Sequence, residues 1–211
     1  MALRYLAEPS LYEASILKSR FITRLFPLER PQGAKALVDQ VRKANYGARH
    51  HATALVAGPD GAQQRSNDDG EPPGTAGAPM LEALRRAQVT DILAVVTRYF
   101  GGTLLGKAGL ARAYGGGVAA ALERAALVVK QPRAGFAVEV AAAQAGLAHH
   151  LLAEFAGRWG EGIGQVEYGE PATFELWLAP QAGPELAKLL AAGPLAAKAR
   201  PLGQRLVTIA G

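Results

Sequence analysis

Asp91-Ile-Leu-Ala-Val-Val-Thr-Arg-Tyr-Phe-Gly-Gly102 contains the clearest strand pattern of this 211-residue chain. Its apolar run from Ile92 to Val96 is short and bounded by polar residues, which is typical of a strand. The run leads into Arg98, two aromatic residues and two glycines, and Lys107 and Arg112 follow at the start of a helical pattern. We therefore expect a strand that carries a basic, aromatic and glycine-rich loop at its end.

An acidic segment, Asn67-Asp-Asp-Gly-Glu-Pro-Pro-Gly-Thr-Ala-Gly77, precedes this strand. Its glycines and prolines are incompatible with a packed helix or a central strand. It is expected to be a shaped loop, the usual place for functional side chains on a rigid scaffold. A short helix over Pro79–Gln88 separates it from the strand, so we expect the acidic and basic loops to lie close together.

Two interpretations of the acidic loop stay open from the residues alone. In the first, its three carboxylates bind a divalent cation or act as general acids, because hard cations prefer carboxylate oxygens. The residues concerned are Asp68, Asp69 and Glu71, with His50 in support. In the second, the aspartates bind backbone amides of a tight turn and Thr75 caps the following helix. Composition favours the second, so we predict no metal, no cofactor and no catalytic residue.

The basic loop predicts an anion site, because glycine-rich backbone amides before a helix attract negative groups. The segment also offers three cations and three aromatic faces, a combination that suits phosphates and stacked bases. These are Arg98, Lys107, Arg112, Tyr99, Phe100 and Tyr114. The spacing from Gly101 to Lys107 imitates a nucleotide-binding P-loop, but Ala108 stands where a hydroxyl would bind Mg²⁺. A nucleotide hydrolase is therefore not indicated.

Composition places the chain among soluble globular proteins. Hydrophobic residues make up 49% of it and charged residues 19%, so it can bury a core. It has no cysteine, which excludes disulfides and agrees with a cytoplasmic location. The N-terminus lacks the apolar run of a signal peptide, and no segment has the roughly 20 apolar residues that span a bilayer. We expect no association with a membrane.

The net charge of +5 is unevenly distributed along the chain. Residues 1–133 contain 18 Lys and Arg against 11 Asp and Glu, whereas residues 134–211 contain 5 against 7. A basic half beside a mildly acidic half indicates that the first faces a polyanion. Ordinary solubilising charge explains an excess of this size equally well.

The clearest break along the chain is Gln131-Pro-Arg-Ala-Gly135, which predicts domains at 1–131 and 132–211. The second domain shows the order strand, helix, strand, strand, helix, strand of a ferredoxin-like fold. Its six elements are expected at 135–141, 144–156, 164–168, 173–178, 184–192 and 205–210. In the first domain, strands are expected at 2–7, 11–17, 19–28, 51–57 and 91–99, and helices at 31–44, 79–88 and 109–128. The glycines at 115–117 indicate that another backbone or a ligand comes close to the last of these helices.

At these motifs the chain resembles the IMPACT/YigZ family, as a bacterial two-domain member. The resemblance rests on Lys18-Ser-Arg-Phe21, His50, Asp68–Gly77, Arg98–Gly102 and Gly109–Tyr114, and it covers most of residues 15–128. It implies an α+β protein with an N-terminal domain similar to domain IV of elongation factor G, of the ribosomal-protein type. It also implies a ferredoxin-like C-terminal domain.

The resemblance further implies a role in the regulation of translation, with RNA, the ribosome or a protein partner as the ligand. We assign anion or nucleic-acid binding to Arg98, Tyr99, Phe100, Gly101, Gly102, Lys107, Arg112 and Tyr114. We assign the shaping of the site to Phe21, His50, Asp68, Asp69, Glu71 and Thr75. Two alternatives to this non-enzymatic binding protein are a metal-assisted hydrolase built on the acidic loop and His50, and an adaptor for an acidic or C-terminal segment of another protein.

Overall fold

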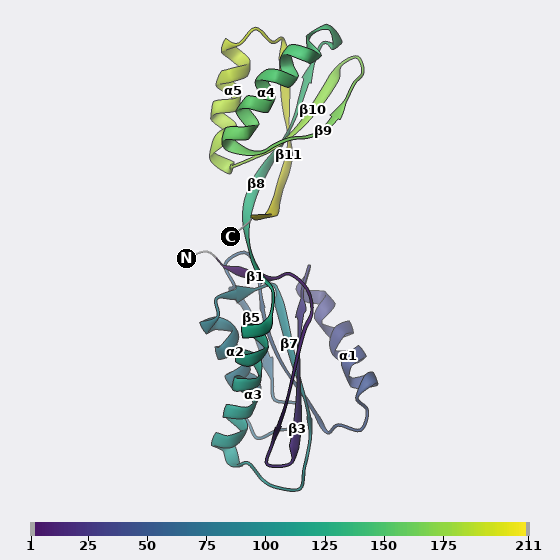
Figure 1. Cartoon of the computed structure of the whole chain (residues 1–211), viewed down its shortest axis with the longest axis vertical. Helices are drawn as coiled ribbons and strands as arrows, with labels where there is room; N and C mark the ends of the chain where they lie inside the picture. Colours follow the sequence, from purple (N-terminus) through teal and green to yellow (C-terminus); the bar gives the residue numbers. More distant parts are fainter. Residues whose placement is uncertain (1–2, 210–211) are drawn as a thin grey trace. The chain divides into compact units, whose positions relative to one another are not determined.

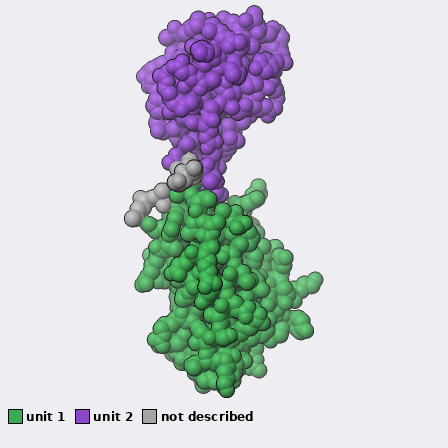
Figure 2. Space-filling model, viewed as in Figure 1, with its two compact units in different colours: residues 1–129, 210–211 green, residues 130–209 purple. Residues whose placement is uncertain are grey.

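The structure is a computed structural model that describes residues 3–209. The chain forms two compact units, the first ending at Val129 and the second running from Lys130 to Ile209 (Figure 2). Each unit combines a β-sheet with packed helices and has its own hydrophobic core. The expected α+β class is therefore confirmed.

The first unit is built around a five-stranded sheet with the strand order β2-β3-β7-β4-β5, in which all neighbours are antiparallel (Figure 1). These strands are β2 (Ser10–Ile16), β3 (Ser19–Pro27), β4 (His50–Ala57), β5 (Gln63–Asn67) and β7 (Ile92–Tyr99). A separate short pairing joins β1 (Arg4–Leu6) to β6 (Val89–Thr90) and to the first residues of β8 (Leu127–Val140). Strand β7, which has the clearest strand pattern in the sequence, is thus the central strand of the sheet.

Strand β7 is buried on both faces, which explains why its apolar residues do not alternate with polar ones. Ile92, Ala94 and Val96 point into one core, and the residues between them point into the other. Since successive side chains of a strand alternate between faces, Arg98 continues the first series. The strand therefore carries a guanidinium toward the interior of the molecule.

Helices cover both faces of this sheet. The helices α2 (Gly77–Arg86) and α3 (Gly106–Arg124) pack on the face of Ile92, and α1 (Ala34–Ala44) packs on the opposite face (Figure 1). A short 3-10 turn at Pro31–Gly33 precedes α1. No helix within residues 3–209 is long and apolar enough to cross a membrane.

Two of the three consecutive glycines in α3 lie close to neighbouring elements, and the third has free space beside it. A Cβ at Gly115 would lie 3.1 Å from the carbonyl oxygen of Pro79 in α2, and one at Gly117 would lie 2.8 Å from Thr23 Oγ1 in β3. A Cβ at Gly116 would meet nothing within 4 Å. The predicted close approach of another backbone is therefore confirmed at Gly115, whereas Gly117 makes room for a side chain.

The second unit follows the predicted order of strand, helix, strand, strand, helix, strand. After the later part of β8 come α4 (Ala145–Trp159), β9 (Gly160–Glu167), β10 (Ala172–Leu178), α5 (Gly183–Ala192) and β11 (Ala197–Ile209). Short 3-10 turns at Ala142–Gln144 and Pro180–Ala182 lead into the two helices. The sheet order is β11-β8-β10-β9. In β10, every second residue is buried under the helices, so the other face of this sheet carries the alternate side chains.

Several predicted boundaries differ from the structure. The break expected at 131–135 lies inside β8, because the fixed φ of proline also suits an extended backbone. Helix α3 ends at Arg124 rather than at 128, because Leu127 already starts β8. Strands β5 and β6 were not predicted: β5 is polar and exposed throughout, and β6 has only two residues. The end of the last strand, expected at residue 210, falls outside the described residues.

Candidate functional site

The motif residues gather at one end of the five-stranded sheet, which we call the loop end. It comprises the β2–β3 turn at Leu17-Lys18, the acidic loop 67–77 and the glycine-containing loop 100–105 between β7 and α3, which we call the basic loop because Arg98 and Lys107 flank it. Strand register brings these segments together, because Arg98 near the end of β7 is paired with Phe21 of β3 and His50 of β4. The three segments therefore meet although they are distant in sequence.

At the centre of the loop end, Glu71, Arg98 and Tyr114 form a buried triad. Glu71 Oε1 accepts hydrogen bonds from Arg98 Nη1 and from Tyr114 Oη, each at 2.7 Å. The side chains of Arg98 and Glu71 are only 6% and 3% exposed, so their ion pair is removed from water. The acidic loop, β7 and α3 contribute one residue each. Glu71 of the acidic loop thus meets Arg98 and Tyr114 at the two ends of the basic segment 98–114, which confirms the predicted proximity of the two segments.

Two phenylalanine rings enclose the guanidinium of the triad. Arg98 Cζ lies 5.5 Å from the ring centre of Phe21 and 5.4 Å from that of Phe100, within the range of cation–π attraction. Phe21 also meets Tyr114 edge-on, with ring centres 5.4 Å apart. Burial, followed by the bond to Glu71, raises the pKa of the Tyr114 hydroxyl well above its ordinary value. Tyr114 is therefore a hydrogen-bond donor to Glu71 at neutral pH.

Two of the residues to which we assigned anion binding are not at the surface. Arg98 and Tyr114 are buried, and both are engaged by Glu71. Arg98 is inside because it extends the inward series of β7, and Tyr114 lies on the face of α3 that packs on the sheet. The expectation that these two side chains meet an anion in solvent is corrected accordingly. Phe21 and Glu71, to which we assigned the shaping of the site, both contact Arg98.

Asp68 caps the start of α2. Its Oδ1 accepts the amides of Ala76 and Gly77 at 2.9 and 2.8 Å, and its Oδ2 accepts the amide of Gly74 at 2.8 Å. Burial alone would raise the pKa of Asp68, but the three amide bonds outweigh it and hold the pKa below its ordinary value. The capping role predicted for Thr75 is wrong, because its hydroxyl donates to the carbonyl of Pro72 at 2.6 Å instead.

Asp69 joins the acidic loop to β4 and α1. Its carboxylate forms an ion pair with Arg42, and Oδ2 accepts the amide of His51 at 2.6 Å. Its carbonyl oxygen lies 2.8 Å from Nδ1 of His50. Burial opposes ionisation of Asp69, but the bonds from Arg42 and the His51 amide hold its pKa below the ordinary value. Burial, together with the charge of Arg42, lowers the pKa of His51.

The second of the two sequence interpretations is confirmed for Asp68, which binds amides of its own loop, whereas Asp69 and Glu71 bind residues of other elements. Each of the three carboxylates of the acidic loop is occupied by amides, by an arginine or by a tyrosine of the chain. Within residues 3–209, no three His, Cys, Asp or Glu side chains gather so that they could hold a metal ion. The arrangement gives no support to a hydrolase built on these residues.

The outer layer of the loop end is basic and partly apolar. Lys18, Lys107 and Arg112 are exposed, and none of them forms an ion pair with another residue of the described chain. The basic loop is fixed against the β2–β3 turn at Gly101, where a Cβ would lie 2.0 Å from the Lys18 carbonyl oxygen. The next residue, Gly102, has a φ of 86°, a conformation that favours glycine.

Tyr99 lies on the α1 face of the sheet and fixes the segment that follows α1. Its hydroxyl donates to Asn45 Oδ1 at 3.1 Å, and Asn45 Nδ2 donates to the carbonyl of Val41 at 2.8 Å. Arg20 Cζ lies 5.7 Å from the Tyr99 ring centre. The anchored segment carries Tyr46, an exposed residue that the sequence motifs did not indicate.

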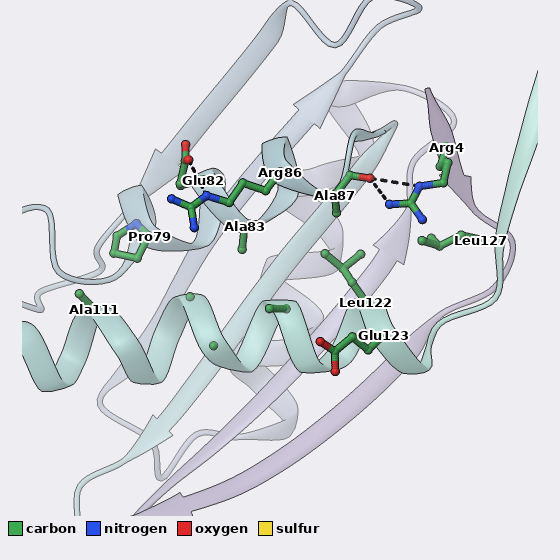
Figure 3. Close-up of a pocket in the computed structure, with 13 residues that line it drawn as sticks. Arg4, Pro79, Glu82, Ala83, Arg86, Ala87, Ala111, Leu122, Glu123 and Leu127 are labelled. Carbon is green, nitrogen blue, oxygen red and sulfur yellow. Dashed lines mark hydrogen bonds and ion pairs between the residues drawn. The ribbon is translucent and has the colours of Figure 1, made fainter. Parts of the chain in front are cut away.

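A cleft of about 600 Å³ lies between α2 and α3 (Figure 3). Gly116 opens into it, so the glycine run was the sequence signal for this feature. The arginines on its rim are engaged within the chain: Arg86 Nε donates to Glu82 at 2.9 Å, and Arg4 Nε donates to the Ala87 carbonyl at 3.1 Å. The cleft therefore offers mainly apolar surface and few of the convergent polar groups that orient a ligand.

Comparison with known proteins places the motifs of the loop end in one family. Residues 17–122 match the Impact N-terminal domain. The Escherichia coli protein "IMPACT family member YigZ" is 51% identical over 128 residues, which are 60% of this chain and 63% of that protein. A Haemophilus influenzae "IMPACT family member" is 44% identical over 69% of this chain and 71% of its own length. The match thus spans less than two thirds of the length of the E. coli relative.

One solved structure resembles nearly the whole chain. A crystal structure described as that of a hypothetical protein is 37% identical in sequence, with a TM-score of 0.65. The similarity covers 94% of this chain and 97% of that one. Both units therefore have counterparts in a single known protein chain.

Proposed function

This chain belongs to the IMPACT family, and we propose that it is a non-enzymatic binding protein that associates with RNA or the ribosome and acts in the regulation of translation. The translational role rests on the family resemblance of its motifs. The RNA-binding role rests on one observation at the loop end. The carboxylates of the acidic loop turn inward to partners in the chain, whereas Lys18, Lys107 and Arg112 face solvent.

This separation of charge favours a polyanionic ligand. A phosphate backbone binds to unpaired surface cations with release of its counterions, and it needs no reactive side chain on the protein. The excess of Lys and Arg in residues 1–133 adds a positive electrostatic potential, which also attracts a polyanion. Glycine backbone at the start of α3 lets a chain of phosphates approach closely. RNA fits these features better than an acidic protein segment, because its phosphates repeat regularly.

The triad supports a structural role rather than catalysis. A general acid or base must reach a substrate, whereas Glu71 and Arg98 are buried and hydrogen-bonded to each other. We infer that the triad holds the acidic loop, β7 and α3 in place so that the cations outside keep their positions. Asp68 and Asp69 have the same function for the start of α2 and for β4.

We further infer the relationship of each unit to a known fold. The first unit has the antiparallel sheet with helices that the resemblance to domain IV of elongation factor G implies. The second unit has the element order and the strand order β11-β8-β10-β9 of a ferredoxin-like domain. Both relationships agree with a protein of the translation machinery.

The test is binding of the full chain to labelled RNA and to ribosomes over a salt series. Three phosphate contacts predict a log–log salt slope of about −2 to −3. The double variant Lys107→Glu with Arg112→Glu is expected to weaken binding by about tenfold or more, because each change replaces an attraction by a repulsion. The control is Lys188→Glu with Lys198→Glu, which makes the same change of net charge on the second unit.

Two outcomes would contradict the proposal. The first is an absence of RNA and ribosome binding at low salt. The second is equal affinity of the folded loop-end variant and the control variant. Binding to ribosomes that does not weaken with salt would instead indicate a protein partner, as the adaptor alternative predicts.

A further inference from the structure

The loop end also carries an unusual share of exposed apolar side chains. Eight large hydrophobic side chains of the described residues are exposed, and four of them lie at or beside the loop end. They are Leu17 at 59%, Tyr46 at 92%, Phe100 at 45% and Leu104 at 83% exposure. Leu17 and Leu104 come from the β2–β3 turn and the basic loop, and Tyr46 follows α1. Apolar side chains exposed together at one end of the sheet make that end a candidate contact surface.

Of these four side chains, Phe100 is the one that its neighbours hold most firmly in place. Arg98 Cζ lies 5.4 Å from its ring centre on the inner side, and Arg98 is itself held by Glu71. The next residue is fixed as well, because the Gly101 amide donates to Ser19 Oγ at 3.2 Å and its backbone touches the β2–β3 turn. The ring is therefore held from within, while almost half of the residue stays open to solvent.

Two lysines belong to the segments next to Phe100. Lys18 belongs to the β2–β3 turn against which Gly101 packs, and Lys107 lies in the first turn of α3. Both are exposed and without an ion pair to another described residue. The loop end thus combines a fixed aromatic face with flanking positive charge, which is the arrangement that single-stranded nucleic acid requires.

We propose that the loop end binds single-stranded RNA, with an unpaired base stacked on Phe100 and the neighbouring phosphates held by Lys18 and Lys107. This inference rests on the proposed association with RNA and states which form of RNA is bound. In a duplex, bases are stacked on each other and their faces are closed to a side chain. An exposed phenylalanine gains nothing from a duplex, whereas unpaired bases of any sequence offer it a face.

The experiment compares two RNA probes with the full chain by fluorescence anisotropy. One is a single strand of about 12 nucleotides, within the usual range of single-strand sites, and the other is the same strand paired with its complement. The variant Phe100→Leu keeps an apolar side chain but removes the ring. It is expected to weaken single-strand binding by about tenfold, the lower range for one base stack, and to leave the salt slope unchanged.

Two further variants separate stacking from charge. Lys107→Ala is expected to lower the magnitude of the salt slope by about 0.7, the contribution of one phosphate contact in a single strand. Phe100→Trp retains a ring, so it is expected to keep the affinity and to show quenching of its fluorescence by the single strand above that of the parent chain. Tyr168→Leu, which changes another exposed ring (73%) on the second unit, is the matched control and should bind like the parent chain.

The outcomes distinguish this inference from the proposed function. If the chain binds RNA but Phe100→Leu binds the single strand as tightly as the parent, or if the duplex binds as well, stacking is refuted and RNA association stands. If neither probe nor the ribosome binds at low salt, the proposed function itself fails. Melting of each variant, followed by circular dichroism, shows whether it is folded.

Discussion

Replacing Glu71 with glutamine tests the buried triad directly. Glutamine has nearly the same shape, and its amide oxygen can still accept the hydrogen bond from Tyr114. The change removes the negative charge that lies 2.7 Å from Arg98. Because an arginine does not lose its proton in proteins, a buried cation is left without a counter-charge. We expect the first unit to lose stability for this reason alone.

The size of the loss follows from the burial of the pair. With 6% and 3% exposure of the two side chains, solvent screens their interaction very little. Removing one partner of a buried ion pair typically costs about 3–5 kcal/mol. Since one hydrogen bond and the shape are kept, we expect the lower value, about 3 kcal/mol of unfolding free energy. Adding Arg98→Met should recover about 2 kcal/mol, because it removes the unpaired charge.

The assay must report on the first unit separately. Both tryptophans, Trp159 and Trp177, lie in the second unit, so their fluorescence follows that unit alone. Amide hydrogen exchange of peptides from β3 and β7, measured by mass spectrometry, follows the first unit. A loss of about 3 kcal/mol corresponds to roughly 150-fold faster exchange of amides that open only by global unfolding.

Two results would refute the reasoning about the triad. One is an increase of less than tenfold in the exchange of the slowest β7 amides. The other is a double variant whose loss equals the sum of the two single losses. Glu154→Gln serves as the control, because it breaks an exposed ion pair with Arg158 in the second unit. Such a pair contributes about 0–1 kcal/mol, so exchange in β3 and β7 should not change.

Three further substitutions test the local structure of the first unit. Gly116→Ala is expected to raise the unfolding free energy by about 0.5–1 kcal/mol, because alanine favours the helix and its Cβ meets no atom. Gly117→Ala places a Cβ 2.8 Å from Thr23 Oγ1 and is expected to lower the unfolding free energy. Urea unfolding measures both variants, and a shift of their midpoints in the same direction would contradict the argument. The pKa of Asp68 is lower in the folded chain than its unfolded value of about 4. Ionised Asp68 therefore stabilises the fold at pH values above about 4, and this stabilisation is lost as the pH falls through the folded pKa. Asp68→Asn is therefore expected to lower the unfolding free energy at neutral pH. In urea unfolding at decreasing pH, this variant should lose less of its unfolding free energy than the parent chain. If both chains lost the same amount, the stabilising role of the three amide bonds would be contradicted.

Most elements of the fold could be predicted because their signals are local. The apolar run of β7 and the helical period of α1 are visible in windows of about ten residues. Strand β5 could not be predicted, because it is polar and exposed, and its strand conformation depends on its pairing with β4. Pro132 lies inside β8 rather than in a linker, because proline suits an extended strand as well, and the two compact units divide at Val129, close to the predicted boundary after residue 131.

For the candidate site, the sequence indicated the right segments but not the role of each side chain. The acidic loop does meet the basic segment, through Glu71 and Arg98, and Asp68 binds amides of its own loop. The cap of α2 was assigned to Thr75, next to the helix, whereas Asp68 provides it from nine residues before Gly77. The motifs did not indicate the exposed Tyr46, because the preceding residue, Asn45, is held beside β7 by a long-range bond from Tyr99.

The sequence by itself determined the strands and helices with strong periodicity, the α+β class and the motifs that define the family. Only the tertiary structure decided which charges are buried and which face solvent. The partner that neutralises Arg98 lies 27 residues away, and the strand register alone directs that side chain toward it. A shift of register by one residue would turn Arg98 to the opposite face of the sheet. Burial of a charge depends on such long-range pairing, which no local pattern of residues records.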